Sequence, residues 1–156
     1  YVREDAGEKL CLFRCGDGLY ALPHKHVLWE GAPRPVHTIP RRSGRLLRGL
    51  IAHEGQLHLC VAVHEILGQP SSGPEGRLLI VEVEGSSWAF EVDELLGESI
   101  VALGSASADP TQPMARSVID WQDQVVAVLD AHHLHSAAER ALRAAEAEDT
   151  SLGGVA

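Results

Sequence analysis

The chain repeats itself at one fixed offset. When the sequence is shifted by 68 residues, segment 11–28 lies over 79–96, and segment 51–66 lies over 119–134. One offset serves both pairs without a gap, which indicates a duplicated unit of about that length. The matched residues include Leu12 with Ile80, Tyr20 with Trp88, Ala21 with Ala89, Leu22 with Phe90, Gln56 with Gln124, Val61 with Leu129 and His64 with His132. The fold must therefore accommodate two similar units.

Each unit is predicted to be a set of short β-strands. Apolar and aromatic runs alternate with turn residues that tolerate positive φ, as hairpins require. The turns are Gly16-Asp17-Gly18 and Glu54-Gly55 in the first unit, and Glu84-Gly85-Ser86 and Gln122-Asp123 in the second. Many short strands at regular spacing are typical of small barrels. The sequence thus predicts a mainly β fold with two small barrels side by side.

The remaining elements set the expected boundaries. A short helical turn at 63–67 ends at Gly68, and Gly/Ser/Pro-rich linkers follow at 69–76 and 104–113. Ser136 is predicted to be the N-cap of a helix over 136–148, with Glu139 completing a capping box. We expect one subdomain at about 10–70, a second at about 76–135, the C-terminal helix at 136–148 and a flexible tail at 149–156.

The composition narrows the class of protein. A hydrophobic content of 45% can supply a buried core, and no apolar stretch approaches the ~18 residues of a membrane span. Three cysteines in no regular framework favour a reducing compartment. The net charge of -9 disfavours general nucleic-acid binding, which needs a basic surface for phosphates. We expect a soluble globular protein of a reducing compartment, with no segment that marks secretion.

A metal site is the first chemical alternative. Cys11 and Cys15, followed by His24 and His26, have a spacing that departs from the usual zinc pattern. The repeat places Leu79, Val83, Val92 and Glu94 at the matching positions, and it places Val128 at the position of Cys60. Cysteines at apolar positions of a repeated strand behave as small hydrophobic residues. The sequence therefore predicts no metal ion and no cofactor.

Catalysis is the second alternative, and the sequence predicts no enzyme. The histidines at 53, 132, 133 and 135 have no evident nucleophile partner, and no glycine-rich phosphate loop is present. The acidic residues of 82–98 are typical of solvated faces rather than of a buried acid and base pair. A binding module that works through strand edges, turn tips and loops remains.

Arginines cluster in one connection of the chain. Arg41, Arg42, Arg45 and Arg48 fall within a short segment that also contains proline and glycine. The segment is either a solvated loop or a docking patch for an acidic protein surface. A barrel module that binds nucleic acid or a small ligand through this patch is the alternative function, against which the acidic remainder of the chain argues.

Three segments together resemble the CheW family of chemotaxis coupling proteins. In HTIPRRSGRLLRGLIAHEGQLHLCVAVHEILG, a proline, a glycine that opens an apolar strand, a hairpin, a second strand and Leu-Gly follow in the family's order. The segment RLLIVEVEGSSWAFEVDELLGE resembles the next block, and VIDWQDQVVAVLDAHHL is similar to the closing hairpin. The matching positions are Pro40, Gly49, Leu50, Ile51, Gly55, Leu57, Val61, Leu67, Gly68, Leu129, Asp130 and Leu134. The resemblance covers about 11–142.

The resemblance implies a fold and a function. Residues 1–148 would form one CheW-like domain, with two five-stranded SH3-like barrels around a shared core. Members of the family are non-enzymatic cytoplasmic adaptors that join a methyl-accepting chemoreceptor to a CheA-type histidine kinase in receptor arrays at the inner membrane. Carried over by position, Val27, Trp29 and Gly49 would lie near the kinase, and Glu54 and Gly55 would face the receptor.

The chain departs from the family pattern at three positions. Glu54 stands where the family normally has arginine, Trp29 where many members have glutamate, and Ala62 where they have aspartate. A reversed charge at a partner contact can cost several kcal/mol with the wrong partner. We therefore expect a specialised member, with altered or lost receptor binding, in a pathway such as surface sensing or pilus-driven movement. Trp29 is either an exposed contact residue or part of the core.

Overall fold

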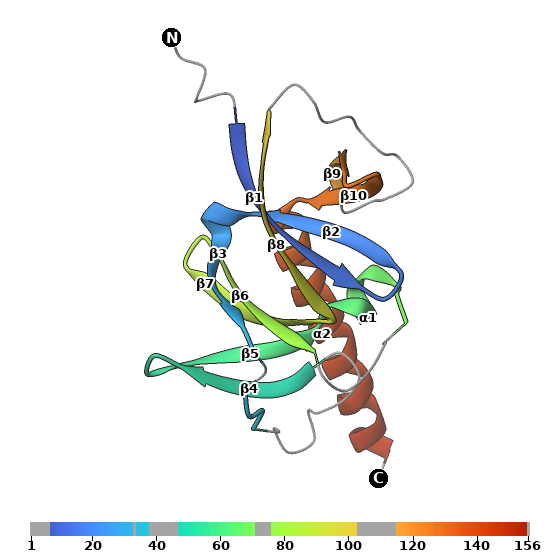
Figure 1. Ribbon diagram of the computed structural model, residues 1–156. Coiled ribbons are helices and arrows are strands. Elements are labelled where there is room, and N and C mark those ends of the chain that lie inside the picture. Colours follow the sequence, from blue (N-terminus) through green and yellow to red (C-terminus); the bar gives the residue numbers. More distant parts are fainter. Residues whose placement is uncertain (1–6, 33, 38–46, 71–75, 103–114, 156) are drawn as a thin grey trace.

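The computed structural model describes residues 7–32, 34–37, 47–70, 76–102 and 115–155, and within them it contains two five-stranded sheets and two α-helices (Figure 1). The strands are β1 (Gly7–Cys15), β2 (Gly18–Pro23), β3 (Val27–Gly31), β4 (Leu47–His53), β5 (Gln56–Ala62), β6 (Arg77–Val83), β7 (Ser86–Val92), β8 (Glu94–Ala102), β9 (Ala115–Trp121) and β10 (Gln124–Leu129). A 3-10 turn, η2 (His24–His26), joins β2 to β3. The mainly β class and the four hairpin turns are as the sequence predicts.

The two sheets exchange strands between the two halves of the chain. One sheet has the order β8-β1-β2-β10-β9, and the other has the order β3-β6-β7-β5-β4. Each sheet therefore combines the first hairpin of one repeat with three later strands of the other repeat. The sheets do not coincide with residues 10–70 and 76–135, the subdomains expected from the sequence.

The exchange is reciprocal, and it preserves the repeat. Moving each strand by the 68-residue offset converts β3-β6-β7-β5-β4 into β8-β1-β2-β10-β9 in the same order. In both sheets the central pairing is parallel, between β2 and β10 or between β7 and β5. Within the described residues the outer strands of each sheet are not paired with one another, so the sheets are open. The expectation of closed barrels is corrected in this respect.

Three apolar clusters hold the sheets together. The largest joins both sheets to the C-terminal helix, through side chains such as Phe13, Phe90 and Leu134. Each sheet also encloses a smaller cluster of its own, and these two clusters are related by the repeat. One contains Leu10, Leu12, Ala21, Ile119, Val126 and Val128, and the other contains Ile51, Cys60, Leu78, Ile80 and Ala89.

The helices begin and end at residues that satisfy backbone groups. Helix α1 (Val63–Leu67) ends at Gly68, whose φ of 72° is left-handed, as predicted. Helix α2 (Ala131–Val155) runs alongside both sheets and packs on the core that they share (Figure 1). It begins earlier than the predicted Ser136, because Asp130 Oδ1 accepts hydrogen bonds from the backbone N–H of His132 and His133. It also continues through 149–155, where the sequence led us to expect a tail.

The Asp130 cap also affects the pKa of the Asp130 carboxyl group. Burial alone would raise the pKa of Asp130, but hydrogen bonds from the backbone of His133 and His132 outweigh it and hold the pKa below its ordinary value.

Within the described residues, no helix is long and apolar enough to cross a bilayer.

The three cysteines are free thiols in buried positions. Cys15 belongs to the large cluster and Cys60 to a small one, as expected for cysteines at apolar repeat positions. Burial is the main cause that raises the pKa of each of the three thiols to about 12. Cys11 belongs to none of the three apolar clusters that the described residues form.

Candidate partner-binding surface

The hairpin tip between β4 and β5 is the most exposed of the predicted contact sites. The Glu54 side chain is 84% exposed, and its Oε1 lies 3.9 Å from Nε2 of His53. Glu54 and Gly55 both have positive φ, at 49° and 78°. Leu57 on the same hairpin is 65% exposed. The tip thus presents a carboxylate and an apolar side chain to solvent.

Strand β3 lies at the edge of its sheet and contains a β-bulge. Val27 pairs with Val81 and Trp29 pairs with Ile80, so Leu28 is left over between them. In a regular strand Val27 and Trp29 would share one face. The bulge separates them, because Val27 packs on the large cluster whereas Trp29 packs on the small cluster of its own sheet. Leu28 is 53% exposed at this edge.

The sequence left open whether Trp29 is an exposed contact residue or part of the core, and in the structure it is partly both. It is half-buried and packs on apolar side chains of its sheet. Its ring centroid lies 5.0 Å from that of His53, on the opposite outer strand β4, and the Arg34 guanidinium lies 4.5 Å above the ring. Trp29 therefore bridges the open edges of the sheet and presents only part of its surface to solvent.

Gly49 shapes the backbone of β4 rather than offering a side chain. It is buried, has a φ of 146° and lies at a register shift between Leu47 and Gly49. An added Cβ would lie 2.4 Å from the His37 carbonyl oxygen. His37 in turn exchanges two backbone hydrogen bonds with Leu50, each 2.8 Å long. Gly49 thus permits a close approach of the preceding loop to the strand.

A buried histidine distinguishes this sheet from its repeat partner. His58 on β5 is 3% exposed, and its Nδ1 lies 2.8 Å from the Ser87 hydroxyl. The offset places Val126 at the position of His58, so the second sheet is apolar there. Burial, assisted by His53, lowers the pKa of His58 and so favours the neutral imidazole ring.

Of the four arginines in the predicted docking patch, the structure describes Arg48. Its Nε lies 3.2 Å from Oε1 of Glu91, and both side chains are about one-third exposed. This pairing reduces the charge that Arg48 can offer to an acidic or nucleic-acid partner. Arg41, Arg42 and Arg45 lie outside the described residues.

Among the side chains that the structure describes, four large apolar ones are exposed that the sequence did not predict. They are Leu28, Leu57, Ile100 and Val125. Leu28 lies at the bulge of β3, where it pairs with no residue of β6. Leu57 and Val125 occupy equivalent repeat positions near two hairpin tips, so the repeat itself was the available signal. Single exposed apolar residues are common, and only their location makes them candidates for contacts.

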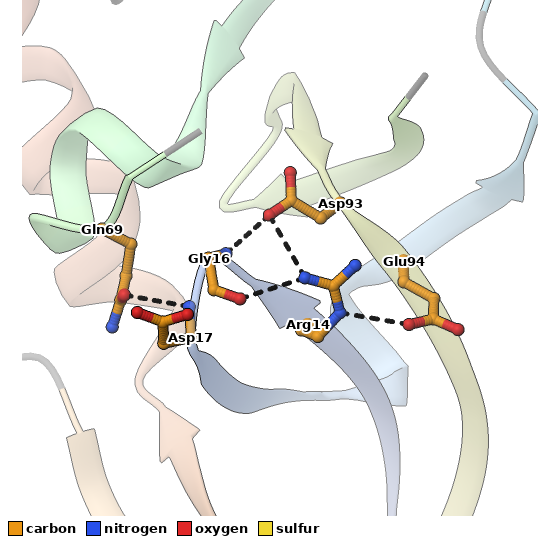
Figure 2. A network of polar contacts seen from close by, with 6 residues as sticks. All are labelled: Arg14, Gly16, Asp17, Gln69, Asp93 and Glu94. Carbon is orange, nitrogen blue, oxygen red and sulfur yellow. Dashed lines mark hydrogen bonds and ion pairs between the residues drawn. The ribbon is translucent and has the colours of Figure 1, made fainter. Parts of the chain in front are cut away.

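A polar network connects the chain crossing between the sheets to the β1–β2 turn (Figure 2). Asp93 lies between β7 of one sheet and β8 of the other, and its Oδ2 accepts a 2.6 Å hydrogen bond from Gly16 N–H. Arg14 Nη1 donates to the Gly16 carbonyl oxygen at 3.0 Å, and Arg14 Nε donates to Glu94 at 3.1 Å. The Gln69 side chain accepts from the backbone N–H of Asp17 and donates to the Tyr20 hydroxyl. The network connects the segments that follow β7 and α1 to the β1–β2 turn.

We expect Asp93→Ala to lower the free energy of unfolding by about 2 kcal/mol, because it leaves the buried Gly16 N–H without its acceptor. Glu94→Ala is the matched control, since Glu94 contacts the same arginine but is more than half exposed. It should cost less than about 0.5 kcal/mol. Urea unfolding of both variants measures the difference, and equal losses would contradict the role assigned to Asp93.

Comparisons with known proteins agree with the resemblance seen in the sequence. The family model described as CheW-like domain matches residues 9–139. The crystal structure of the scaffolding protein TtCheW from Thermoanaerobacter tengcongensis has a similar fold, with a TM-score of 0.73 at 19% sequence identity. The match covers 81% of this chain and 91% of that chain. No curated protein matches the chain.

Proposed function

Because the chain belongs to the family of CheW-like domains, we propose that it is a non-enzymatic adaptor that couples a methyl-accepting chemoreceptor to a CheA-type histidine kinase. The observation that carries the proposal is the family match over 9–139, together with exposed contact residues on the sheet that contains β3, β4 and β5. An adaptor of this kind acts in the cytoplasm and is recruited to receptor arrays at the inner membrane.

The kinase contact is assigned to the β3 edge. Leu28 supplies an exposed apolar side chain, and the half-buried Trp29 lies beside it. Val27 and Gly49 act indirectly in this proposal. Val27 anchors β3 on the large core, and Gly49 sets the path of β4. Large aromatic side chains such as Trp29 are enriched among the residues that dominate binding at protein interfaces.

We expect Leu28→Asp to weaken binding to the regulatory domain of the cognate kinase at least about tenfold, because a charge would be buried without a partner. Isothermal titration with the purified kinase domain measures the affinity. Val125→Asp is the control, since Val125 is 64% exposed on β10 of the other sheet. Equal affinities for wild type and Leu28→Asp would remove β3 from the kinase interface.

The receptor contact is assigned to the β4–β5 hairpin tip, at Glu54 and Gly55. The carboxylate of Glu54 reverses the charge that the family pattern has at this turn, so the cognate receptor should offer a basic side chain there. A reversed charge also supports a specialised pathway, such as surface sensing or pilus-driven movement, rather than flagellar swimming.

We expect Glu54→Arg to weaken binding of the cognate receptor tip at least about tenfold while leaving the thermal stability unchanged. The matched control is Gln122→Arg, because Gln122 occupies the equivalent position of the β9–β10 turn with the same φ of 49°. A titration with a soluble receptor fragment compares the two. If Glu54→Arg binds like wild type, the hairpin tip lies outside the receptor interface.

A further inference from the structure

Three donor atoms of different chemistry converge where the chain crosses from one sheet to the other. His24 Nε2 lies 2.9 Å from Oε2 of Glu98, and Cys11 Sγ lies 4.0 Å from the same oxygen. All three donor atoms lie within 4.8 Å of one another. They come from η2, β8 and β1, so they are brought together only by the fold.

The repeat shows that this group is specific to one half of the molecule. At the offset of 68 residues, the counterparts of Cys11, His24 and Glu98 are Leu79, Val92 and Glu30. The second copy of the site therefore keeps one carboxylate but has two apolar residues in place of the thiol and the imidazole. The fold itself does not require a thiol or an imidazole at these positions.

The surroundings of Cys11 differ from those of the other two cysteines. Cys15 and Cys60 pack in apolar clusters, whereas Cys11 is 1% exposed and faces carboxylates. The Glu30 carboxylate also lies beside Cys11. Lys9 Nζ lies 3.1 Å from Oε1 of Glu98, which leaves Oε2 facing His24 and Cys11. A supporting contact of this kind orients metal-binding carboxylates.

We propose that Cys11, His24 and Glu98 bind a zinc ion. Thiolate, imidazole and carboxylate are the ligands zinc uses in proteins, and tetrahedral coordination places neighbouring ligand atoms about 3.3–3.6 Å apart. The two separations from Glu98 Oε2, 2.9 and 4.0 Å, require shifts of about half an ångström to reach this range, and the third, between Cys11 and His24, lies within 4.8 Å and requires a shift of up to about 1.2 Å. Binding releases the thiol proton to solvent, and a water molecule completes the coordination. The ion would tie η2, which leads into β3, to the sheet that contains β1 and β8.

The structure also shows why spacing in the sequence missed this group. Cys15 and His26, the nearest candidates along the chain, are not part of it, and His26 Nδ1 instead lies 3.2 Å from the Glu82 carbonyl oxygen. The third ligand, Glu98, is far from Cys11 in the sequence. It lies on β8, which pairs with β1 so that Glu98 is directly opposite Cys11.

The test uses the full chain without a histidine tag, reduced and freed of metal with a chelator. Titration with Co²⁺ should produce a thiolate-to-cobalt charge-transfer band that saturates at one equivalent and disappears when Zn²⁺ is added. Competition with a chromophoric chelator gives the zinc affinity. His24→Val and Cys11→Leu introduce the residues of the second copy, and each should lower the affinity at least about 100-fold, more than loss of an outer-shell contact costs.

Matched controls are Cys60→Val, which also introduces the repeat counterpart, and His26→Ala, which alters the same 3-10 turn. Both should bind zinc like wild type. His24 is 42% exposed, so His24→Val keeps the test informative even if Cys11→Leu is unstable. Absence of the charge-transfer band in wild type, or its persistence in His24→Val and Cys11→Leu, would overturn the proposal and leave a metal-free ion-pair network of His24, Glu98 and Lys9.

Discussion

Fragments 1–70 and 76–156 are expected to remain unfolded when they are separate and to fold when they are mixed. The first fragment contains β1 to β5, but its β1–β2 hairpin pairs with β8 and β10 of the second fragment. The reverse holds for the β6–β7 hairpin, which pairs with β3 and β5. Isolated two-stranded hairpins are marginally stable at best, and each fragment would also expose its share of the common core.

Circular dichroism and urea unfolding of the single fragments, of their equimolar mixture and of the intact chain provide the measurement. We expect a cooperative transition only for the mixture and the intact chain. The mixture should also unfold at lower urea when it is diluted, because association then depends on concentration. A cooperative transition of either fragment alone would show that one half can form a sheet without exchanging its hairpin.

The exchange itself could not be predicted from the repeat. Local turn chemistry is readable in the sequence because residues such as Gly16 and Gly55 adopt positive φ, and these turns were predicted correctly. The partner of each hairpin is set by contacts between distant segments. Both copies have a similar pattern of apolar residues, so this pattern alone does not indicate whether a hairpin pairs with its own three strands or with those of the other copy. The repeat in the sequence therefore predicted the two units but not which strands pair within each sheet.

The beginning of α2 could have been predicted from the repeat. Both Asp130 and Ser136 are good N-cap residues, and the capping box favoured Ser136. The 68-residue offset, however, places Val63 over Ala131, so the beginning of α1 already marked the beginning of α2. Asp130 was then the residue in position to accept the two free N–H groups.

The candidate contact residues were predicted only in part, and the reason is the backbone of the edge strands. Alternation along β3 would place Val27 and Trp29 on one face, but the bulge at Leu28 separates them. A bulge depends on how two strands pair, which no local residue type encodes here. The exposed hairpin tip at Glu54 was predictable, because a turn of this kind projects from the sheet wherever the strands pair.

Gly49→Ala is expected to lower the free energy of unfolding by roughly 3–5 kcal/mol, the sum of backbone strain and a steric clash. The φ of 146° is unfavourable for any residue with a side chain. In addition, the new methyl group would lie 2.4 Å from the His37 carbonyl oxygen, within a pair of backbone hydrogen bonds that the loop cannot easily release. The midpoint of thermal unfolding should fall by more than about 6 °C.

Gly97→Ala separates the two contributions, because Gly97 also lies in an edge strand with positive φ, at 102°, but has nothing within 4 Å of an added Cβ. It should therefore cost only the backbone strain, about 1–3 kcal/mol. If Gly49→Ala is no less stable than Gly97→Ala, the loop does not hold His37 against the strand. If Gly49→Ala instead stays folded at low temperature and binds the kinase with wild-type affinity, then Gly49 maintains the strand and is not itself a contact. Its position in the family pattern would then reflect the close approach of two backbone segments.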